Sequence, residues 1–106
     1  MKRVQAVIRP ERLDAVQHRL AEAGFVGVMV YDVRGHGSEE QATGEYRGVA
    51  FSMSVKHKLL VDVLLEDDEV AAAVAAIQSG GASGKPGDGL IFVADVAGIY
   101  PVDPRT

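Results

Sequence analysis

A glycine-rich turn lies directly before an apolar stretch near the C-terminus. Residues 84–93 read GKPGDGLIFV, so Gly87 and Gly89 flank Asp88 just before a run that is typical of a buried strand. Glycine leaves the backbone exposed, and neighbouring amide N–H groups can then approach and bind an anion. The same triplet is also common in plain turns. The residues alone leave both interpretations open.

A second glycine pair flanks a histidine, in Gly35-His36-Gly37. This segment is interpreted either as a flexible strand end or as a second contact to an anion, since a histidine ring can donate a hydrogen bond. The three histidines fall on different predicted elements and the chain has no cysteine, so no metal site is predicted. The sequence also lacks a recognisable Ser/His/Asp or paired-carboxylate arrangement, and we predict a protein that is not an enzyme.

The composition favours protein or small-molecule partners. The 106 residues carry a net charge of −4, which argues against general affinity for nucleic acid or anionic lipid. The apolar residues of MKRVQAVIRP alternate with polar ones instead of forming the apolar core of a signal peptide, and no apolar run reaches the roughly 20 residues that a membrane helix needs. We therefore expect one cytoplasmic domain over residues 1–106, without membrane insertion.

Hydrophobic periodicity predicts four strands and two helices in the order βαββαβ. The expected strands are 2–9, 25–33, 58–65 and 90–100, and the expected helices run from Pro10 to Gly24 and over 67–78, the second with Asp67 or Asp68 as its N-cap. This order predicts an α+β, ferredoxin-like fold, with an antiparallel four-stranded sheet and two helices on one face. An acylphosphatase-like hydrolase on this fold is a weak alternative, because the chain contains no asparagine.

Two features suggest that the domain does not act alone. The strand predicted over 25–33 is apolar on both faces, yet two helices cover only one face of a sheet. Self-association of the chain would cover the face that the helices leave exposed. The polar stretch 35–57, predicted as a loop, is also unusually long for so small a domain, and such loops are often functional.

With these elements in place, nearly the whole chain resembles the P-II signal-transduction family. The segments that carry the resemblance are AVIRPERLDAVQHRLAEAGFVGVMV (6–30), VRGHG (33–37), EYRG (45–48), LLEDDEV (64–70) and SGKPGDGLIFV (83–93). The resemblance implies a homotrimer that binds adenine nucleotides in clefts between subunits. It also implies a T-loop, here about 37–55, that contacts a target transporter, enzyme or regulator.

The resemblance also assigns roles to individual residues. Nucleotide or anion binding is implied for Gly35, His36, Gly37, Leu64, Gly87, Asp88 and Gly89, the last three within a turn loop at about 80–89. Effector binding is implied for Glu39 and Lys58, and partner binding for Glu45, Tyr46, Arg47 and Phe51. No resident cofactor is expected, and ATP, ADP or AMP is the implied effector class.

Several residues depart from the family pattern. Four cations expected around a triphosphate are replaced by Ser38, Leu90, Pro101 and Asp103. Losing several charge-assisted hydrogen bonds predicts weaker ATP binding.

Two further departures concern the effector and covalent modification. Glu39 replaces a glutamine that helps to bind Mg²⁺ and 2-oxoglutarate, and Phe51 replaces a tyrosine that many bacterial members modify. The sequence thus predicts a P-II-like regulator, in nitrogen regulation or, as the alternative, an adaptor outside nitrogen control that responds to AMP, ADP, cyclic AMP, bicarbonate or no nucleotide.

Overall fold

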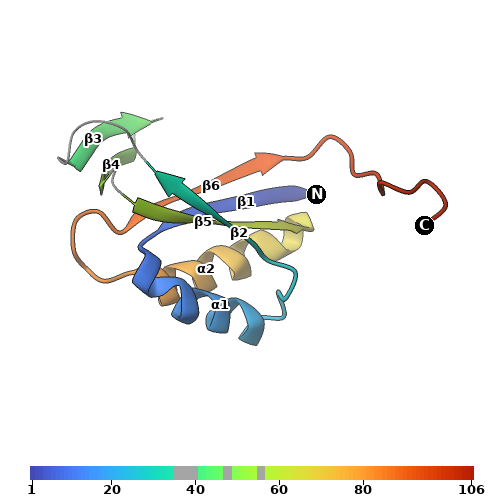
Figure 1. Cartoon of the computed structure of the whole chain (residues 1–106), viewed down its shortest axis with the longest axis horizontal. Helices are drawn as coiled ribbons and strands as arrows, with labels where there is room; N and C mark the ends of the chain where they lie inside the picture. The colour runs from blue at the N-terminus through green and yellow to red at the C-terminus, as the bar shows by residue number, and fades with distance from the viewer. Residues whose placement is uncertain (35–40, 47–48, 55–56) are drawn as a thin grey trace.

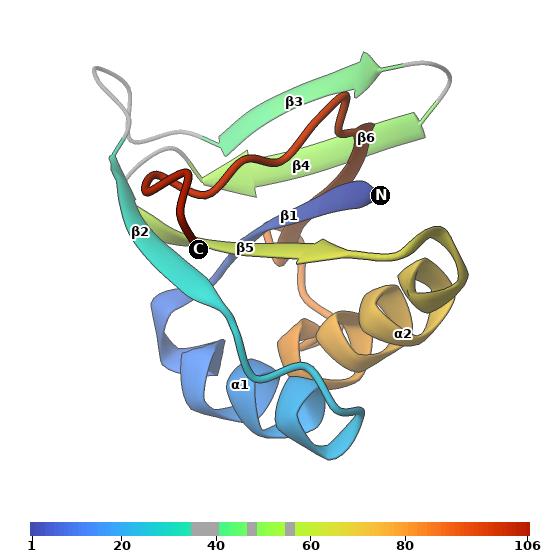
Figure 2. The same ribbon diagram turned by 90° about the vertical axis from the view of Figure 1, so that its right-hand side faces the viewer.

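The molecule is a four-stranded sheet with two helices packed on one face. The computed structural model describes residues 1–34, 41–46, 49–54 and 57–106, with 41–46 and 49–54 described by their backbone alone. The strand order of the main sheet is β2-β5-β1-β6, all antiparallel, formed by Met29–Arg34, His57–Leu65, Lys2–Ile8 and Gly89–Asp95. Helices α1 (Leu13–Glu22) and α2 (Val70–Gly81) lie together under the sheet (Figures 1 and 2). The predicted ferredoxin-like fold is confirmed.

Each helix begins with a short 3₁₀ turn. Pro10 opens the turn Pro10–Arg12 before α1, where its missing N–H costs nothing. The turn Asp67–Glu69 precedes α2, and its N-cap is Glu66. The side chains of Glu66 and Glu69 each accept a hydrogen bond from the backbone N–H of the other residue, which is a capping box. The predicted N-cap at Asp67 or Asp68 is therefore wrong by one or two positions.

The second strand begins later than predicted. Gly24 adopts a left-handed conformation, with φ of +96°, and ends α1. The amide N–H of Phe25 then bonds back to the Leu20 carbonyl at 2.8 Å, as in a Schellman cap. Because that N–H serves the helix, the chain enters the sheet only at Met29.

The final strand and the long loop also differ from prediction. β6 ends at Asp95, opposite Lys2, and beyond it one further backbone bond runs from the Val96 N–H to the Met1 carbonyl at 3.2 Å. The stretch 35–57, predicted as a loop, contains two antiparallel strands, β3 (Gln41–Tyr46) and β4 (Val49–Ser54).

The core lies between the helices and the facing side of the sheet. Val4, Ala6 and Ile8 of β1 point towards the helices and are buried with Val16 and Leu20 of α1. No helix of the described residues covers the opposite side of the sheet, which is partly apolar. Its exposed hydrophobic side chains include Met29, Tyr31, Leu64 and Phe92, each at least 40% accessible. We call this side the helix-free face.

The close packing of the two helices depends on one glycine. A Cβ atom added at Gly80 would lie 2.7 Å from the Val16 Cα atom and 2.8 Å from the backbone of Ala15. These are backbone atoms that cannot rotate away. Gly80, beyond the end of the predicted helix at residue 78, is therefore buried in α2 because α1 approaches it closely.

We predict that Gly80→Ala lowers the free energy of unfolding by about 1–3 kcal/mol, because overpacking outweighs the gain in helix propensity. Gly27→Ala is the matched control, since no atom lies within 4 Å of a Cβ added there. Urea unfolding at equal chain concentration would measure both. Equal stabilities for the two variants would contradict the prediction.

Candidate functional site

The carboxylate of Asp88 organises the turn between α2 and β6. It accepts hydrogen bonds from the backbone N–H of Ser83 at 2.8 Å and of Gly84 at 3.1 Å. It also accepts from the Ser83 hydroxyl and, at 3.0 Å, from Nε of Arg9. The side chain of Asp88 thus points into its own turn and links the end of the turn to Ser83 and Gly84 by hydrogen bonds.

These bonds change the acidity of Asp88. Burial alone would raise its pKa, but the hydrogen bonds from Ser83, Arg9 and Gly84 outweigh burial and hold the pKa of Asp88 well below its usual range. The carboxylate is therefore ionised throughout the neutral range. A permanently charged carboxylate stabilises a turn that consists largely of backbone donors.

The two glycines beside Asp88 have conformations that favour glycine. Gly87 has φ of +89° and Gly89 has φ of +124°. A Cβ atom at Gly89 would lie 1.8 Å from the carbonyl oxygen of Val7, so no other residue fits there. The turn is consequently fixed both by its backbone conformation and by its contact with β1.

Two cations from neighbouring strands also bind this turn. Nη2 of Arg9 donates to the Pro86 carbonyl at 2.7 Å, and the ammonium of Lys58 donates to the Gly87 carbonyl. Lys58 is only 4% exposed. Burial, and secondly the charge of Arg9, lower the pKa of Lys58. The turn is therefore held by two cations, of which Arg9 also pairs with the Asp88 carboxylate.

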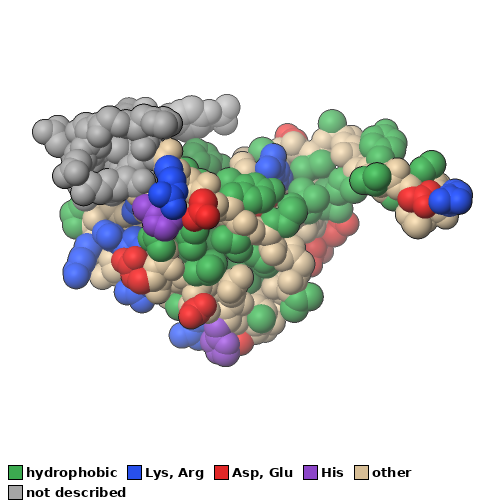
Figure 3. Space-filling view, viewed as in Figure 1, with side chains coloured by type: hydrophobic (Ala, Val, Ile, Leu, Met, Phe, Trp, Pro, Cys, Tyr) green, Lys and Arg blue, Asp and Glu red, His purple; other side chains and the backbone are tan. Residues whose placement is uncertain are grey.

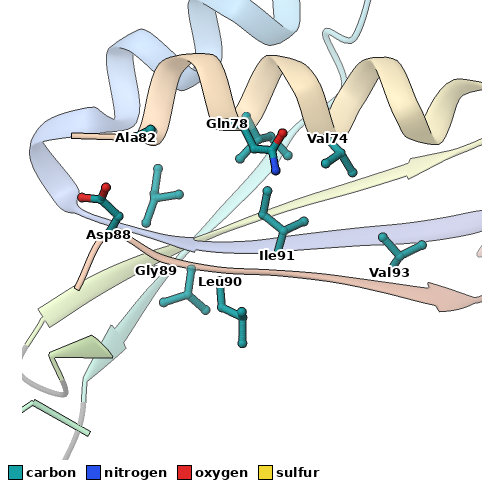
Figure 4. Close-up of a pocket in the computed structure, with 12 residues that line it drawn as sticks. Val74, Gln78, Ala82, Asp88, Gly89, Leu90, Ile91 and Val93 are labelled. Atoms are coloured by element: carbon teal, nitrogen blue, oxygen red, sulfur yellow. The ribbon is translucent and has the colours of Figure 1, made fainter. Parts of the chain in front are cut away.

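An apolar groove of about 390 Å³ runs from the turn along α2 and β6. Figure 4 shows Ile91 and Val93 of β6 directed towards α2, with Asp88 at one end of the groove. Leu90 points to the other side of the strand (Figure 4). This surface offers hydrophobic contact next to the charged turn.

The structure does not bring Leu64 to the turn. Leu64 pairs with Arg3 at the start of β1, whereas Gly89 pairs with Ile8 at its end. Five residues of strand separate these positions, about 17 Å at the usual rise per residue. Leu64 instead borders a second groove of about 560 Å³, beside Asp62 and Arg3. Asp62 is fully buried, and Nη2 of Arg3 donates to it at 2.6 Å.

The comparisons with known proteins agree with this architecture. The family model described as nitrogen regulatory protein P-II matches residues 1–105. The chain belongs to the P-II family. A nitrogen regulatory protein P-II from Microchaete diplosiphon is 41% identical over 102 residues, 96% of this chain and 91% of the relative. One from Cereibacter sphaeroides is 42% identical over 96 residues, which cover 91% of this chain and 86% of the relative.

A third relative is the nitrogen regulatory protein P-II 1 of Escherichia coli K12, which is 38% identical over 102 residues, 96% of this chain and 91% of the relative. All three relatives are named as regulatory proteins and none as an enzyme. Membership of the P-II family therefore supports a regulatory role for this chain.

The family's effector and T-loop positions are described only in part. Gly35, His36, Gly37, Glu39 and Arg47 lie outside the described residues. Glu45 and Tyr46 lie on the backbone of β3 and Phe51 on that of β4, with Gly44 opposite Phe51 in the register. The predicted partner residues therefore belong largely to one hairpin.

Among the residues that the structure describes, no group of three His, Asp or Glu side chains is arranged to hold a metal ion. Within the same residues, no helix has the length and hydrophobic character of a membrane span.

The sequence interpretation missed Arg9 and Ser83. Arg9 was detectable in principle, because pairing the first and last strands antiparallel places the residue after Ile8 next to the residue before Gly89. Ser83 gave no such signal, since its role depends on how the turn folds back on itself. The turn is also shorter than the predicted 80–89, because Gly80 and Gly81 belong to α2 and Gly89 begins β6.

We predict that Asp88→Asn lowers the free energy of unfolding at pH 7. The difference in free energy of unfolding between the variant and the wild type should become smaller at acidic pH. The folded pKa of Asp88 lies below its unfolded value of about 3.9, so its contribution is complete above that value and is lost as the pH falls through and below it. Urea unfolding at pH 7 and pH 3 would measure the difference, with the exposed Asp68→Asn as control. A difference that stays constant with pH would contradict this assignment.

Proposed function

We propose that this chain is a non-enzymatic P-II-type regulator. It binds a small anionic metabolite or adenine nucleotide in clefts between subunits, and it controls a partner protein through the T-loop at about 37–55. The observation that carries the proposal is the turn at 83–89, which is preformed by Asp88 and whose conformation depends on Gly87 and Gly89. Backbone N–H groups in such a turn attract anions without any cofactor, and since Asp88 already holds those of Ser83 and Gly84, the proposed anion contact is with the amides around Gly87 and Gly89.

The positions of Leu64 and of the turn support a site that is shared between copies. The two are at opposite ends of β1, too far apart to contact one nucleotide in a single chain. If both contribute to one site, the second must come from another copy. Association through the helix-free face would supply that copy and would also cover Met29, Tyr31 and Phe92.

The hairpin β3–β4 supports the proposed partner contact. Its two strands pair with each other in a two-stranded sheet, and the ladders of the described residues do not join it to the main sheet, although β4 lies near β6. They carry Glu45, Tyr46 and Phe51, which the family resemblance places in the partner-binding loop. A partner that adds to this hairpin would use backbone hydrogen bonds for affinity and these side chains for specificity.

The ligand distinguishes two versions of the proposal. The ordinary version is a nucleotide sensor in nitrogen regulation. The second is an adaptor for AMP, ADP, cyclic AMP or bicarbonate outside nitrogen control. The second version is favoured by Leu90, which Figure 4 draws as a hydrocarbon side chain beside the turn, where the family resemblance implies a lysine. Thermal shifts with ATP, ADP, AMP, cyclic AMP and bicarbonate, measured side by side, would decide between them.

We predict a trimer in solution, because the helix-free face otherwise leaves large apolar side chains in water. Phe92→Lys should lower the sedimenting mass towards that of one chain, since it places a charge in that face. Ala75→Lys is the control, because Ala75 is exposed on α2, away from that face. A folded wild-type monomer at micromolar concentration would refute the shared site.

We predict that ATP binds weakly and that restoring two cations strengthens it. The double variant Ser38→Arg, Leu90→Lys should bind ATP at least about tenfold more tightly than the wild type, since each charge-assisted hydrogen bond contributes about 1.5–3 kcal/mol. Calorimetry would measure this, with Ala75→Lys, Ser79→Arg on the exposed face of α2 as the control for net charge. Micromolar ATP affinity in the wild type, increased by Mg²⁺ and 2-oxoglutarate, would restore the ordinary P-II interpretation instead.

A further inference from the structure

A buried ion pair lies at the centre of the helix-free face. Asp62 of β5 is fully buried, although no helix of the described residues covers that side of the sheet. Its carboxylate accepts hydrogen bonds from Nη2 of Arg3 at 2.6 Å and from Nε of Arg3 at 3.1 Å. Nε2 of Gln5 donates to the same carboxylate at 3.4 Å. The carboxylate therefore finds its partners within its own chain.

Apolar side chains lie on both sides of this pair. β5 and β1 are the two central strands of the sheet, and β2 and β6 are its edges. Met29 of β2 pairs directly with Asp62 in the register, and Phe92 of β6 pairs directly with Gln5. These two apolar side chains are 48% and 42% exposed. The helix-free face thus has a polar centre between two apolar edges.

Arg3, unlike Asp62, is still partly in contact with water. Its side chain is 43% exposed and borders the groove of about 560 Å³ beside Leu64. A guanidinium has five N–H donors, and the bonds to Asp62 use two of them. The hydrogen bond to Asp62, and then the negative charge of Asp62, raise the pKa of Arg3, so the guanidinium stays charged. A molecule that covers this face must therefore offer an acceptor to Arg3 or leave water beside it.

We propose that the Arg3–Asp62 pair determines the number and the register of the copies that associate through the helix-free face. The partner is a second copy of this chain. The pair excludes arrangements that would place an apolar side chain of the partner against the guanidinium. This inference rests on the association of copies in the proposed function, and it adds the group that makes the association specific.

Two observations favour a second copy as the occupant of this face. The charges of Arg3 and Asp62 are already matched within one chain, so the centre of the face does not call for an acidic or a basic partner. Leu64 and the turn at Gly89 lie at opposite ends of β1, so only another copy can bring them to one ligand. Continuity with that shared site places the partner copy on this side of the sheet.

The apolar edges and the polar centre have different effects on association. Burial of apolar side chains favours association but is not directional, so the edges alone would tolerate several arrangements of the copies. The remaining donors of Arg3 tolerate fewer, because a buried donor without an acceptor costs more than a hydrogen bond contributes. Replacing a buried ion pair by apolar residues is often neutral or stabilising. Removing this pair should therefore reduce the selectivity of association and leave its strength unchanged or increased.

Native mass spectrometry of the full chain tests the inference. The double variant Arg3→Met, Asp62→Leu removes the pair without changing the net charge. Lys2→Met, Asp95→Leu is the matched control, because it removes an ion pair between β1 and β6 on the side of the sheet that carries the helices. We expect one stoichiometry in the wild type and in the control. In Arg3→Met, Asp62→Leu, the ratio of that assembly to all others should fall at least about tenfold, the change that corresponds to one charge-assisted hydrogen bond.

Two further variants keep the test decisive. Urea unfolding at equal chain concentration shows whether Arg3→Met, Asp62→Leu folds, and we expect it to be at least as stable as the wild type. If it does not fold, Arg3→Gln, Asp62→Asn removes the charges while keeping side chains that hydrogen-bond, and the ratio should fall in the same direction. Adding Phe92→Lys to the folded variant should dissociate every assembly, since each would use the helix-free face. Assemblies that survive Phe92→Lys would use another surface and would overturn the inference.

The outcomes separate this inference from the proposed function. If the wild type and Arg3→Met, Asp62→Leu form the same single assembly, the inference is wrong and the proposed shared site stands. If the wild type is a folded monomer, the shared site is wrong and the inference fails with it. If Lys2→Met, Asp95→Leu broadens the stoichiometry as much as Arg3→Met, Asp62→Leu does, the pair has no specific role and the inference alone is wrong.

Discussion

The ion pair between Arg9 and Asp88 joins the end of β1 to the turn before β6, and the candidate site depends on it. Its two side chains are about three-quarters buried and 3.0 Å apart. Without the carboxylate, the N–H groups of Ser83 and Gly84 would lose their acceptor, and Arg9 would lose its anionic partner. For the partly buried groups of Ser83 and Arg9, being left unpaired costs more than the bonds contribute when made, because these donors then lack the water that they have in the unfolded chain. The site is therefore preformed by the fold itself.

A preformed turn is not sufficient to bind a triphosphate. The turn supplies oriented amide dipoles, which suit one phosphate or another small anion. A triphosphate brings several further charges, whose desolvation is costly without cations. The family resemblance implies such cations at positions that hold Leu90, Pro101 and Asp103 in this chain. Family membership thus explains the shape of the site, whereas the ligand depends on side chains in which this chain differs from the family pattern.

Much of the fold could be predicted because hydrophobic periodicity reports directly on which face is buried. The failures occurred where a local interaction overrode the pattern. Phe25 fits a strand by composition, but its N–H caps α1. The strand β4 was missed although Val49, Phe51 and Met53 alternate with smaller residues, because the glycines and charges around it indicated a loop. At the site, the glycines could be recognised, whereas the ring of bonds around Asp88 could not, since it joins residues that are close only after folding.

The groove beside α2 and the groove beside Leu64 give the sheet different surfaces at its two ends. At the end near Gly89, the turn offers backbone dipoles and the cations Arg9 and Lys58. At the other end, Leu64 lies beside the buried Asp62 and its half-exposed partner Arg3, in a groove that residues 96–100 also line. Figure 3 shows hydrophobic side chains along the extended C-terminal segment. A single chain cannot apply both surfaces to one small ligand. Sharing a ligand between copies would combine them, and it would make ligand affinity depend on assembly, because each bound molecule would then stabilise the contact between the copies that hold it.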